Sequence, residues 1–204
     1  MTTFDAGGRR SPLEGVPLPD GLRELPFLAQ LDLRLDPGDA SVTSAVESVV
    51  GPLPLGPNTV NGGPDGAVLW LGPDEWLIVG PPDGAAALEA QLRAALGQAR
   101  WSASIVDVSA NRTALELRGP GARRILESGC SIDLDPRAFG PGRCAQTLLA
   151  RANVILWQTD DEPVYRIMVR PSFAAYLAAW LSDASDGLKD PGGSSNSRRA
   201  AKRT

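Results

Sequence analysis

The side chains that could carry chemistry are few, because the 204-residue chain contains no histidine. Histidine is the usual general base at neutral pH and a frequent metal ligand. Its absence excludes Ser-His-Asp triads, Cys-His dyads, histidine-bearing zinc sites and a flavin attached through histidine. The two cysteines, Cys130 and Cys144, have no second cysteine at metal-ligand spacing, and we expect them to be small buried side chains. The composition therefore argues against an active site within this chain.

Asp107 is the acidic residue with the strongest claim to a special role, because it interrupts the apolar run from Ile105 to Val108. A buried carboxylate needs a partner, since an unpaired charge in an apolar environment is very costly. Arg112 or a backbone N–H group could supply that partner, which would make the contact structural. Contact with a bound ligand is the alternative. The other acidic cluster, 160–162, precedes Pro163 and is expected in an exposed turn.

The sequence does not contain the common motifs for nucleotide or nucleic-acid binding. No Gly-x-Gly-x-x-Gly follows an expected strand, and no Gly-Lys-Ser/Thr loop occurs. With 24 acidic and 20 basic residues, the net charge of −4 does not favour a nucleic-acid surface. No apolar run approaches the roughly 20 residues of a membrane-spanning helix, and residues 1–21 lack the apolar segment of a signal peptide. We therefore expect a cytoplasmic protein with neither membrane nor nucleic-acid partners.

The elements that must position these residues alternate between strands and helices. Leu31, Leu33 and Leu35 alternate with polar residues, which is typical of a half-buried strand. A capping residue at Asp39 or Ser41 precedes apolar residues at helical spacing. The same reasoning predicts strands at 27–35, 67–71, 76–79, 104–108, 112–118, 145–150, 153–158 and 164–169, and helices between Asp39 and Gly51, Asp83 and Gly97, Gly119 and Gly129, and after Ser172.

This order of elements predicts an α+β fold. The first half reads β-α-β-β-α-β, which is the split unit of ferredoxin-like folds, and the second half begins in a similar way. We therefore expect two ferredoxin-like β-α-β halves within one domain over residues 26–182. Residues 1–25, rich in Pro and Gly, are predicted to be an extended or disordered leader, and residues 183–204 a disordered basic tail.

Several segments in this order resemble the glycine-cleavage T-protein (aminomethyltransferase) family. They are Val106–Ser109, Leu115–Ala122, Ile132–Leu134, Phe139–Gly142 and Gln146–Leu149. In that family the same succession belongs to the folate-binding domain, so the resemblance implies a T-protein-like (aminomethyltransferase folate-binding) domain here.

Three further segments resemble more closely the gamma-subunit family of heterotetrameric sarcosine oxidases. They are Leu69–Leu77, Ser109–Thr113 and Val169–Leu177, and the similarity extends over about residues 27–182. The resemblance implies a supporting subunit of a complex that oxidises sarcosine to glycine with hydrogen peroxide and transfers the one-carbon unit to tetrahydrofolate. It also implies alpha and beta subunits that carry FAD, covalent FMN, NAD and the folate site, and a delta subunit that binds zinc.

The sequence departs from the T-protein pattern where that family does its chemistry. Ala110 and Asn111 stand where T-proteins usually have His-Met, and the stretch 153–158 lacks the carboxylate that serves folate chemistry. The resemblance therefore implies that the fold is kept and the chemistry is lost. Asp107 is left as a weak candidate for a degenerate folate pocket.

The residues expected to contact other subunits come from the family-like segments, since Trp and Arg are enriched at protein interfaces. For Trp76, a position in the core is the alternative. The interface candidates are Asp74, Trp76, Arg112, Arg170 and Phe173.

Two other functions are compatible with the sequence. A stand-alone folate-binding protein would bind tetrahydrofolate by itself, near Asp107. The small subunit of a related N-methyl amino acid dehydrogenase would differ only in the substrate chosen by another chain.

Overall fold

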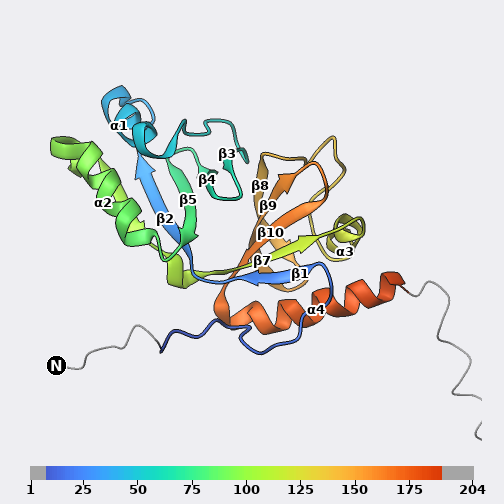
Figure 1. Ribbon diagram of the computed structural model, residues 1–204. Helices are drawn as coiled ribbons and strands as arrows, with labels where there is room; N and C mark the ends of the chain where they lie inside the picture. The colour runs from blue at the N-terminus through green and yellow to red at the C-terminus, as the bar shows by residue number, and fades with distance from the viewer. Residues whose placement is uncertain (1–7, 190–204) are drawn as a thin grey trace, which may run out of the picture.

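The computed structural model describes residues 8–189, which form two five-stranded antiparallel sheets with helices on their outer faces (Figure 1). We call the sheet of order β3-β4-β5-β2-β6 the N-terminal sheet and that of order β1-β7-β10-β9-β8 the C-terminal sheet. The elements are β1 (Leu22–Leu25), β2 (Leu28–Leu35), α1 (Ala40–Val50), β3 (Val60–Gly63), β4 (Gly66–Gly72), β5 (Glu75–Pro82), α2 (Ala85–Leu96), β6 (Ala103–Asp107), β7 (Thr113–Arg118), α3 (Ala122–Glu127), β8 (Arg143–Leu149), β9 (Ala152–Asp160), β10 (Val164–Val169) and α4 (Pro171–Lys189).

The two halves repeat one topology, which confirms the prediction of two ferredoxin-like units. In the N-terminal half, β2-α1-β4-β5-α2-β6 gives the sheet order β4-β5-β2-β6, and β3 is added at the edge. In the C-terminal half, β7-α3-β9-β10-α4 repeats this arrangement, with β8 at the edge. The strand that should follow α4 is replaced by β1, which lies beside β7 as β6 lies beside β2. The beginning of the domain therefore completes its second half.

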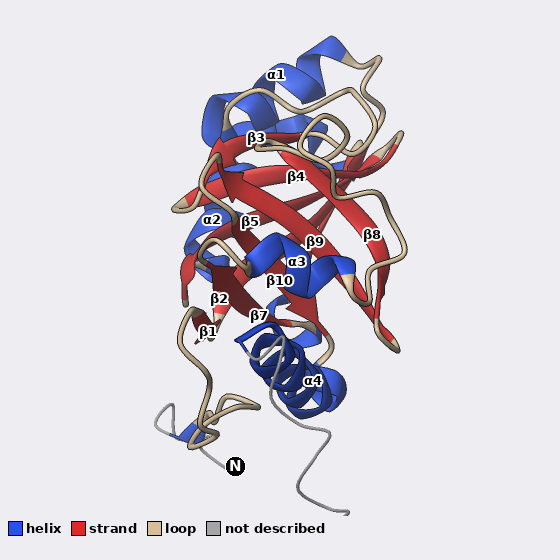
Figure 2. Cartoon of the chain, turned by 90° about the vertical axis from the view of Figure 1, so that its right-hand side faces the viewer, coloured by secondary structure: helices blue, strands red, loops and turns tan. Residues whose placement is uncertain are grey.

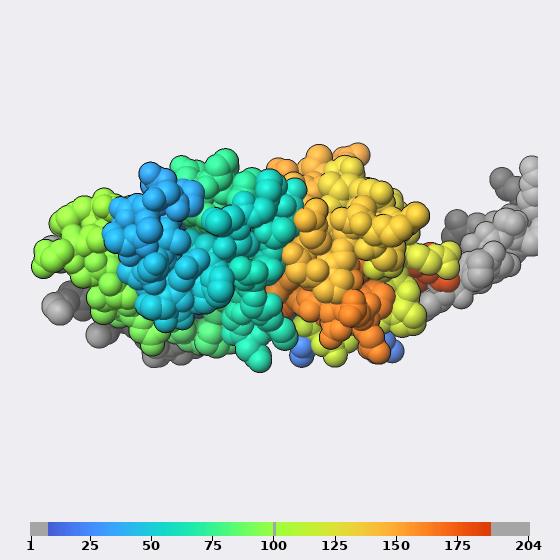
Figure 3. All heavy atoms as spheres, turned by 90° about the horizontal axis from the view of Figure 1, so that it is seen from above, coloured from blue at the N-terminus to red at the C-terminus, as the bar shows by residue number. Residues whose placement is uncertain are grey.

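Figure 2 shows the layers of helices and sheets, and three apolar cores hold these layers together. One lies between the N-terminal sheet and helices α1 and α2, and another between the C-terminal sheet and helices α3 and α4. The third lies between the two sheets and includes Leu69 and Leu77 from one sheet and Ile155 and Met168 from the other. Figure 3 shows the two halves side by side, and the bridge between Thr59 and Arg143 joins them. Strands β4, β5, β9 and β10 are covered on both faces as a result.

The first helix shows how local sequence signals fix the elements. The Asp39 carboxylate accepts hydrogen bonds from the backbone N–H groups of Ser41 and Val42, which satisfies two of the free donors at the start of α1. Gly51, at φ 78°, ends the helix in the left-handed region that glycine adopts readily. Val42 and Val46 are buried against the sheet. Both ends of this helix agree with the prediction.

The predicted disorder at both ends of the domain is wrong for the residues that the structure describes. Leu13 and Leu22 are buried in the core beneath the C-terminal sheet, and residues 22–25 form β1. Helix α4 continues to Lys189 because Leu188 still packs against the same core. None of the helices between residues 8 and 189 combines the length and apolar character that a bilayer crossing needs. Residues 1–7 and 190–204 of the predicted leader and tail lie outside the described residues.

Cys144 is buried and Cys130 is half-buried, and the pair differ in expected reactivity. The Cys144 thiol lies 3.5 Å from the carbonyl oxygen of Trp70, and burial raises its pKa to about 12. Because the thiolate is the reactive form, we expect a disulfide reagent to label one thiol per native chain at pH 8 and two after denaturation. The Cys130→Ser variant should show no labelling before unfolding. Rapid labelling of that native variant would contradict the burial of Cys144.

Candidate functional site

Asp107 lies at the exposed end of β6, an edge strand, so its carboxylate does not carry the cost of a buried charge. Its carboxylate accepts hydrogen bonds from the backbone N–H of Ser109 at 2.9 Å and from the Ser109 hydroxyl at 2.6 Å. These bonds close the turn into the short 3-10 helix Ser109–Asn111. The partners of Asp107 are thus the local backbone and a hydroxyl rather than Arg112. Of the two interpretations, the geometry agrees with a structural contact.

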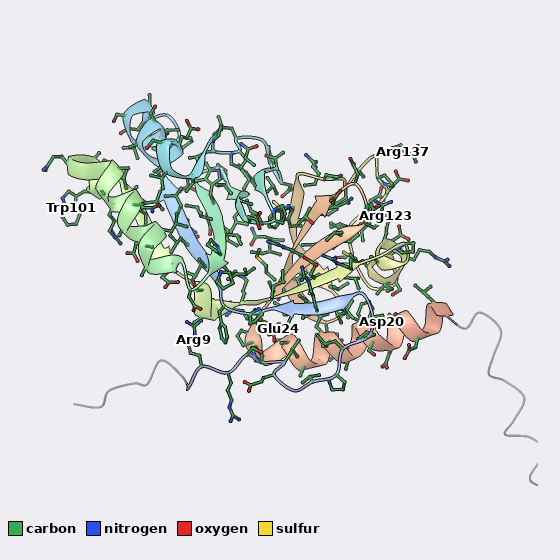
Figure 4. The ribbon with its side chains drawn as sticks, viewed as in Figure 1. Arg9, Asp20, Glu24, Trp101, Arg123 and Arg137 are labelled. Carbon is green, nitrogen blue, oxygen red and sulfur yellow. The ribbon has the colours of Figure 1, made fainter. Side chains whose placement is uncertain are left out.

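A cavity of about 620 Å³ opens beside Asp107, at the junction of the two sheets. Its walls include Arg9, Phe27, Ser109 and Arg112. The Arg9 guanidinium lies 4.3 Å from the centre of the Phe27 ring and 2.9 Å from the Asp83 carboxylate, below this junction (Figure 4). The cavity is therefore bordered by three arginines, Arg9, Arg10 and Arg112, and by Asp107, a mixed lining that suits polar contacts.

Arg112 and Arg170 flank the same end of the C-terminal sheet, because Thr113 of β7 pairs with Val169 of β10. Burial lowers the pKa of Arg112, and the charge of Arg170 lowers it further, whereas Asp32 and Glu75 raise it. The backbone carbonyl of Arg112 accepts a hydrogen bond from the Gln30 side chain at 2.9 Å. Arg112 is thus held by strand β2 of the other sheet.

The charged side chains that act on Arg112 from the N-terminal sheet belong to strands β2 and β5. Arg34 joins two carboxylates there, at 2.8 Å from Glu75 and 3.6 Å from Asp32. Burial raises the pKa of Glu75, the charge of Arg34 opposes that rise, and Asp32 adds to it. We call these residues the junction cluster, which consists of Asp32, Arg34, Glu75, Arg112 and Arg170.

Four of the five interface candidates lie at or beside the junction cluster. Arg112 and Arg170 belong to it, and the exposed Asp74 immediately precedes Glu75. Phe173 stands in the first turn of α4, and its backbone N–H donates to the carbonyl of Arg170 at 2.9 Å. Its ring is 43% exposed and meets the Tyr176 ring edge-on, with 6.4 Å between the ring centres. The structure therefore brings together residues that are far apart in the sequence.

Trp76, the fifth candidate, does not reach the surface, so its choice as a direct contact residue is wrong and its burial agrees with the alternative of a core position. The side chain is fully buried in the core between the N-terminal sheet and its helices. Its indole N–H donates to the carbonyl oxygen of Pro54 at 2.8 Å. Successive side chains of a strand point to opposite faces, so Trp76 points toward the helices and Glu75 points to the opposite face of the sheet. A Trp beside charged turn residues is here a core residue.

A buried charged row on the C-terminal sheet was missed by reasoning from the sequence. Glu116 on β7 and Arg166 on β10 lie opposite each other, and both are buried although they are charged, at 3% and 6% exposure. Glu116 lies on the polar side of the alternating stretch 112–118, and the N-terminal sheet covers much of that face. The available signal was Arg166 itself, a single charge within the apolar run 164–169.

Comparison with known proteins gives one family. The model of the sarcosine oxidase gamma subunit family matches residues 34–187. The sarcosine oxidase subunit gamma of Corynebacterium sp. (strain P-1) is 43% identical over 164 residues, which are 80% of this chain and 78% of that protein. The subunit gamma of an Arthrobacter species is 39% identical over 171 residues, which are 83% of this chain and 82% of that protein.

Solved structures agree with this comparison. A chain of the heterotetrameric sarcosine oxidase from Corynebacterium sp. U-96, in complex with pyrrole 2-carboxylate, matches with a TM-score of 0.79 and 37% identity, over 91% of this chain and 99% of that one. The glycine cleavage system aminomethyltransferase T from Bartonella henselae matches with a TM-score of 0.57 at 15% identity, over 79% of this chain and 45% of that one, which shows a shared fold. The chain belongs to the sarcosine oxidase gamma subunit family.

Proposed function

We propose that this chain is the gamma subunit of a heterotetrameric sarcosine oxidase. The observation that carries the proposal is the match to one chain of such an oxidase at 37% identity over 99% of that chain's length. Similarity of this extent covers both halves of the fold and the junction between them. The proposed role is to support a complex that oxidises sarcosine to glycine with hydrogen peroxide and passes the one-carbon unit to tetrahydrofolate.

We infer that the role is structural and that the reacting groups belong to other subunits. The chain has no histidine, and its one special carboxylate, Asp107, is used to close a turn with Ser109. An aminomethyltransferase-like fold whose Asp107 carboxylate is hydrogen-bonded within its own turn fits a domain that has kept its shape and lost its chemistry. We therefore propose that alpha, beta and delta partner subunits hold FAD, FMN, NAD, zinc and tetrahydrofolate, and that the complex works in the cytoplasm.

The assignment can be tested by purifying the tagged chain from its native cell and identifying by mass spectrometry what accompanies it. We expect a flavin-bearing subunit, a large subunit that binds NAD and folate, and a small zinc subunit. The eluate should produce hydrogen peroxide when sarcosine is added. Oxidation of N-methylglutamate instead of sarcosine in a parallel assay would indicate a related N-methyl amino acid dehydrogenase. A chain that elutes alone and binds tetrahydrofolate by itself would instead be a stand-alone folate-binding protein.

We also propose that the surface around Phe173 and the junction cluster contacts a partner subunit. Replacing Phe173 with alanine is expected to weaken assembly about 10-fold, because exposed aromatic anchors beside arginines are frequent hot spots. The thermal stability of the subunit should change little, since the ring is 43% exposed. The dissociation constant can be measured by diluting the purified complex.

Leu148 provides a control of matched exposure for Phe173, because it is 45% exposed and lies on the edge strand β8, two strands away from β10 in the C-terminal sheet. The Leu148→Ala variant should assemble like the wild type. If the Phe173→Ala complex dissociates no more readily than the Leu148→Ala complex, the surface around Phe173 is not an interface.

A further inference from the structure

A row of charged residues crosses the C-terminal sheet on the face turned toward the N-terminal sheet. Arg23 on β1 pairs with Glu116 on β7, Glu116 with Arg166 on β10, and Arg166 with Trp157 on β9. Directly paired residues of neighbouring strands share a face, and Arg118 shares it because it stands two residues after Glu116. We call Arg23, Arg118 and Arg166 the arginine cluster.

The near charges in this row do not balance. Glu116 accepts a hydrogen bond from Arg23 at 2.8 Å and others from Arg118. Arg166 comes no closer to Glu116 than 4.0 Å, and among the described residues its Nε and Nη1 atoms are buried without a hydrogen-bond acceptor. Asp65, in the turn between β3 and β4, adds a negative charge at longer range. Three arginines therefore share one nearby carboxylate.

A guanidinium remains charged at any physiological pH, so Arg166 cannot escape this environment by losing a proton. Burial lowers its pKa, and the neighbouring Glu116 counteracts this. The Trp157 ring, 5.2 Å away from the guanidinium carbon, compensates only part of the lost hydration. Buried charges are retained with good hydrogen-bonding partners. In the free subunit the cluster lacks one acceptor.

We propose that the arginine cluster binds a carboxylate side chain of another subunit in the complex, an inference that rests on the proposed function. Arg23 and Arg118 form the mouth of the site, since their side chains are 58% and 53% exposed. An incoming carboxylate accepts hydrogen bonds from these two arginines. Glu116 is then free to turn its charge toward Arg166 beneath them. The cluster thereby gains the missing acceptor at the interface.

The surroundings favour a carboxylate fixed on a folded partner over a free anion. A cavity of about 770 Å³ beside Arg118 is also lined by Asp20, Asp160 and Glu162. These acidic residues repel a diffusing anion, whereas docking of a whole protein surface can hold one carboxylate on the arginines and keep other groups away from the acidic wall. Complementary charges of this kind fix the register of an interface.

Arg166→Met distinguishes this role from a purely structural one. Glu116 keeps its hydrogen bonds from Arg23 and Arg118 in this variant, so no buried carboxylate is left unpaired. The substitution also removes two buried N–H groups that lack an acceptor, so the melting temperature of the subunit should stay unchanged or rise. The dissociation constant of the complex should rise about 10-fold or more. Without Arg166, Glu116 has no second cation to turn to, so its hydrogen bonds with Arg23 and Arg118 compete with the incoming carboxylate. A less stable subunit that assembles normally would make Arg166 a structural residue and overturn the proposal.

The exposed mouth provides variants that should fold normally. Arg23→Gln and Arg118→Gln together should also raise the dissociation constant about 10-fold or more. Arg137→Gln is the control, since this arginine is 91% exposed on the loop beyond α3 and pairs with Asp135 (Figure 4). Dissociation of the double variant at the level of this control would overturn the proposal.

Inorganic phosphate tests the alternative of a free anion. Titration of the subunit with phosphate, against sodium chloride of equal ionic strength, should give no extra rise in melting temperature. A rise that disappears in the Arg23→Gln/Arg118→Gln variant, together with normal assembly of that variant, would make the cluster a site for free anions and overturn the docking proposal. Failure of the wild-type chain to form any complex would instead refute the proposed function. That outcome differs from a failure of the docking proposal, in which the wild type assembles and the arginine variants assemble equally well.

Discussion

Replacing Trp76 with alanine is expected to lower the free energy of unfolding by about 3–5 kcal/mol, the cost of removing a large buried aromatic side chain. The ring is fully buried among residues of β2, α1 and β6, and contributes to the core that attaches both helices to the N-terminal sheet. Its loss also leaves the Pro54 carbonyl without the indole N–H that it accepts at 2.8 Å. Urea denaturation followed by circular dichroism measures the change.

Trp76→Phe separates the packing from the hydrogen bond. It keeps most of the apolar volume and removes the N–H donor, so we expect a loss of about 1–3 kcal/mol. Assembly of both variants should decline only as far as the folded fraction declines. A Trp76→Ala subunit that keeps its stability but loses its partners would show that Trp76 acts at the interface after all.

Trp76 shows where reasoning from one sequence succeeds and where it stops. The continuous apolar runs of β4 and β5 correctly predicted strands, and a strand that is covered on both faces lacks the alternating pattern of a half-buried one. In a strand of this kind, however, periodicity does not tell which neighbour each face meets. Glu75 and Trp76 therefore could not be assigned to the surface and the core from their spacing alone.

The missed strand β1 has a different physical reason. The segment 22–25 is short, follows a Pro-rich stretch and shows no strong alternation of apolar and polar residues. Their partner, β7, lies more than 80 residues away in the chain, and pairing over that distance leaves no local signal. The strand exists because the second ferredoxin-like unit lacks its last strand. Topology rather than propensity decides its conformation.

The candidate sites were predictable to the extent that they are local. The Asp107–Ser109 contact spans two residues, and a contact with the backbone was among the expected alternatives. The junction cluster and the arginine cluster require two strands of one sheet, or two sheets, to meet. Arg112 and Arg170 could be chosen from family-like segments, but nothing in the sequence showed that they are neighbours. Arg166 stands out in the sequence as a single charge within an apolar run, but only the packing of the two sheets shows that it is buried beside Glu116.

Glu116→Gln is expected to lower the free energy of unfolding by about 3 kcal/mol at pH 7, because removing the carboxylate leaves neighbouring cations without their anion. The full penalty of an isolated buried charge does not apply, since Arg23 and Arg118 are more than half exposed and partly hydrated. Urea titration at pH 7 measures the difference. Arg137→Gln, which removes one partner of an exposed pair with Asp135, should cost less than about 1 kcal/mol.

The same carboxylate should make the stability of the wild type depend on acid. Burial alone would raise the pKa of Glu116, but hydrogen bonds from Arg23 and Arg118 outweigh it and hold the pKa below its ordinary value of 4.5. A carboxylate whose pKa is lower in the folded state contributes its full stabilisation above the unfolded pKa and loses it as pH falls through the folded one. The gap between wild type and Glu116→Gln should therefore be constant from pH 7 to about pH 5 and shrink at lower pH. Two curves that stay parallel throughout the acid range would show that Glu116 is not the anion that holds this row of arginines.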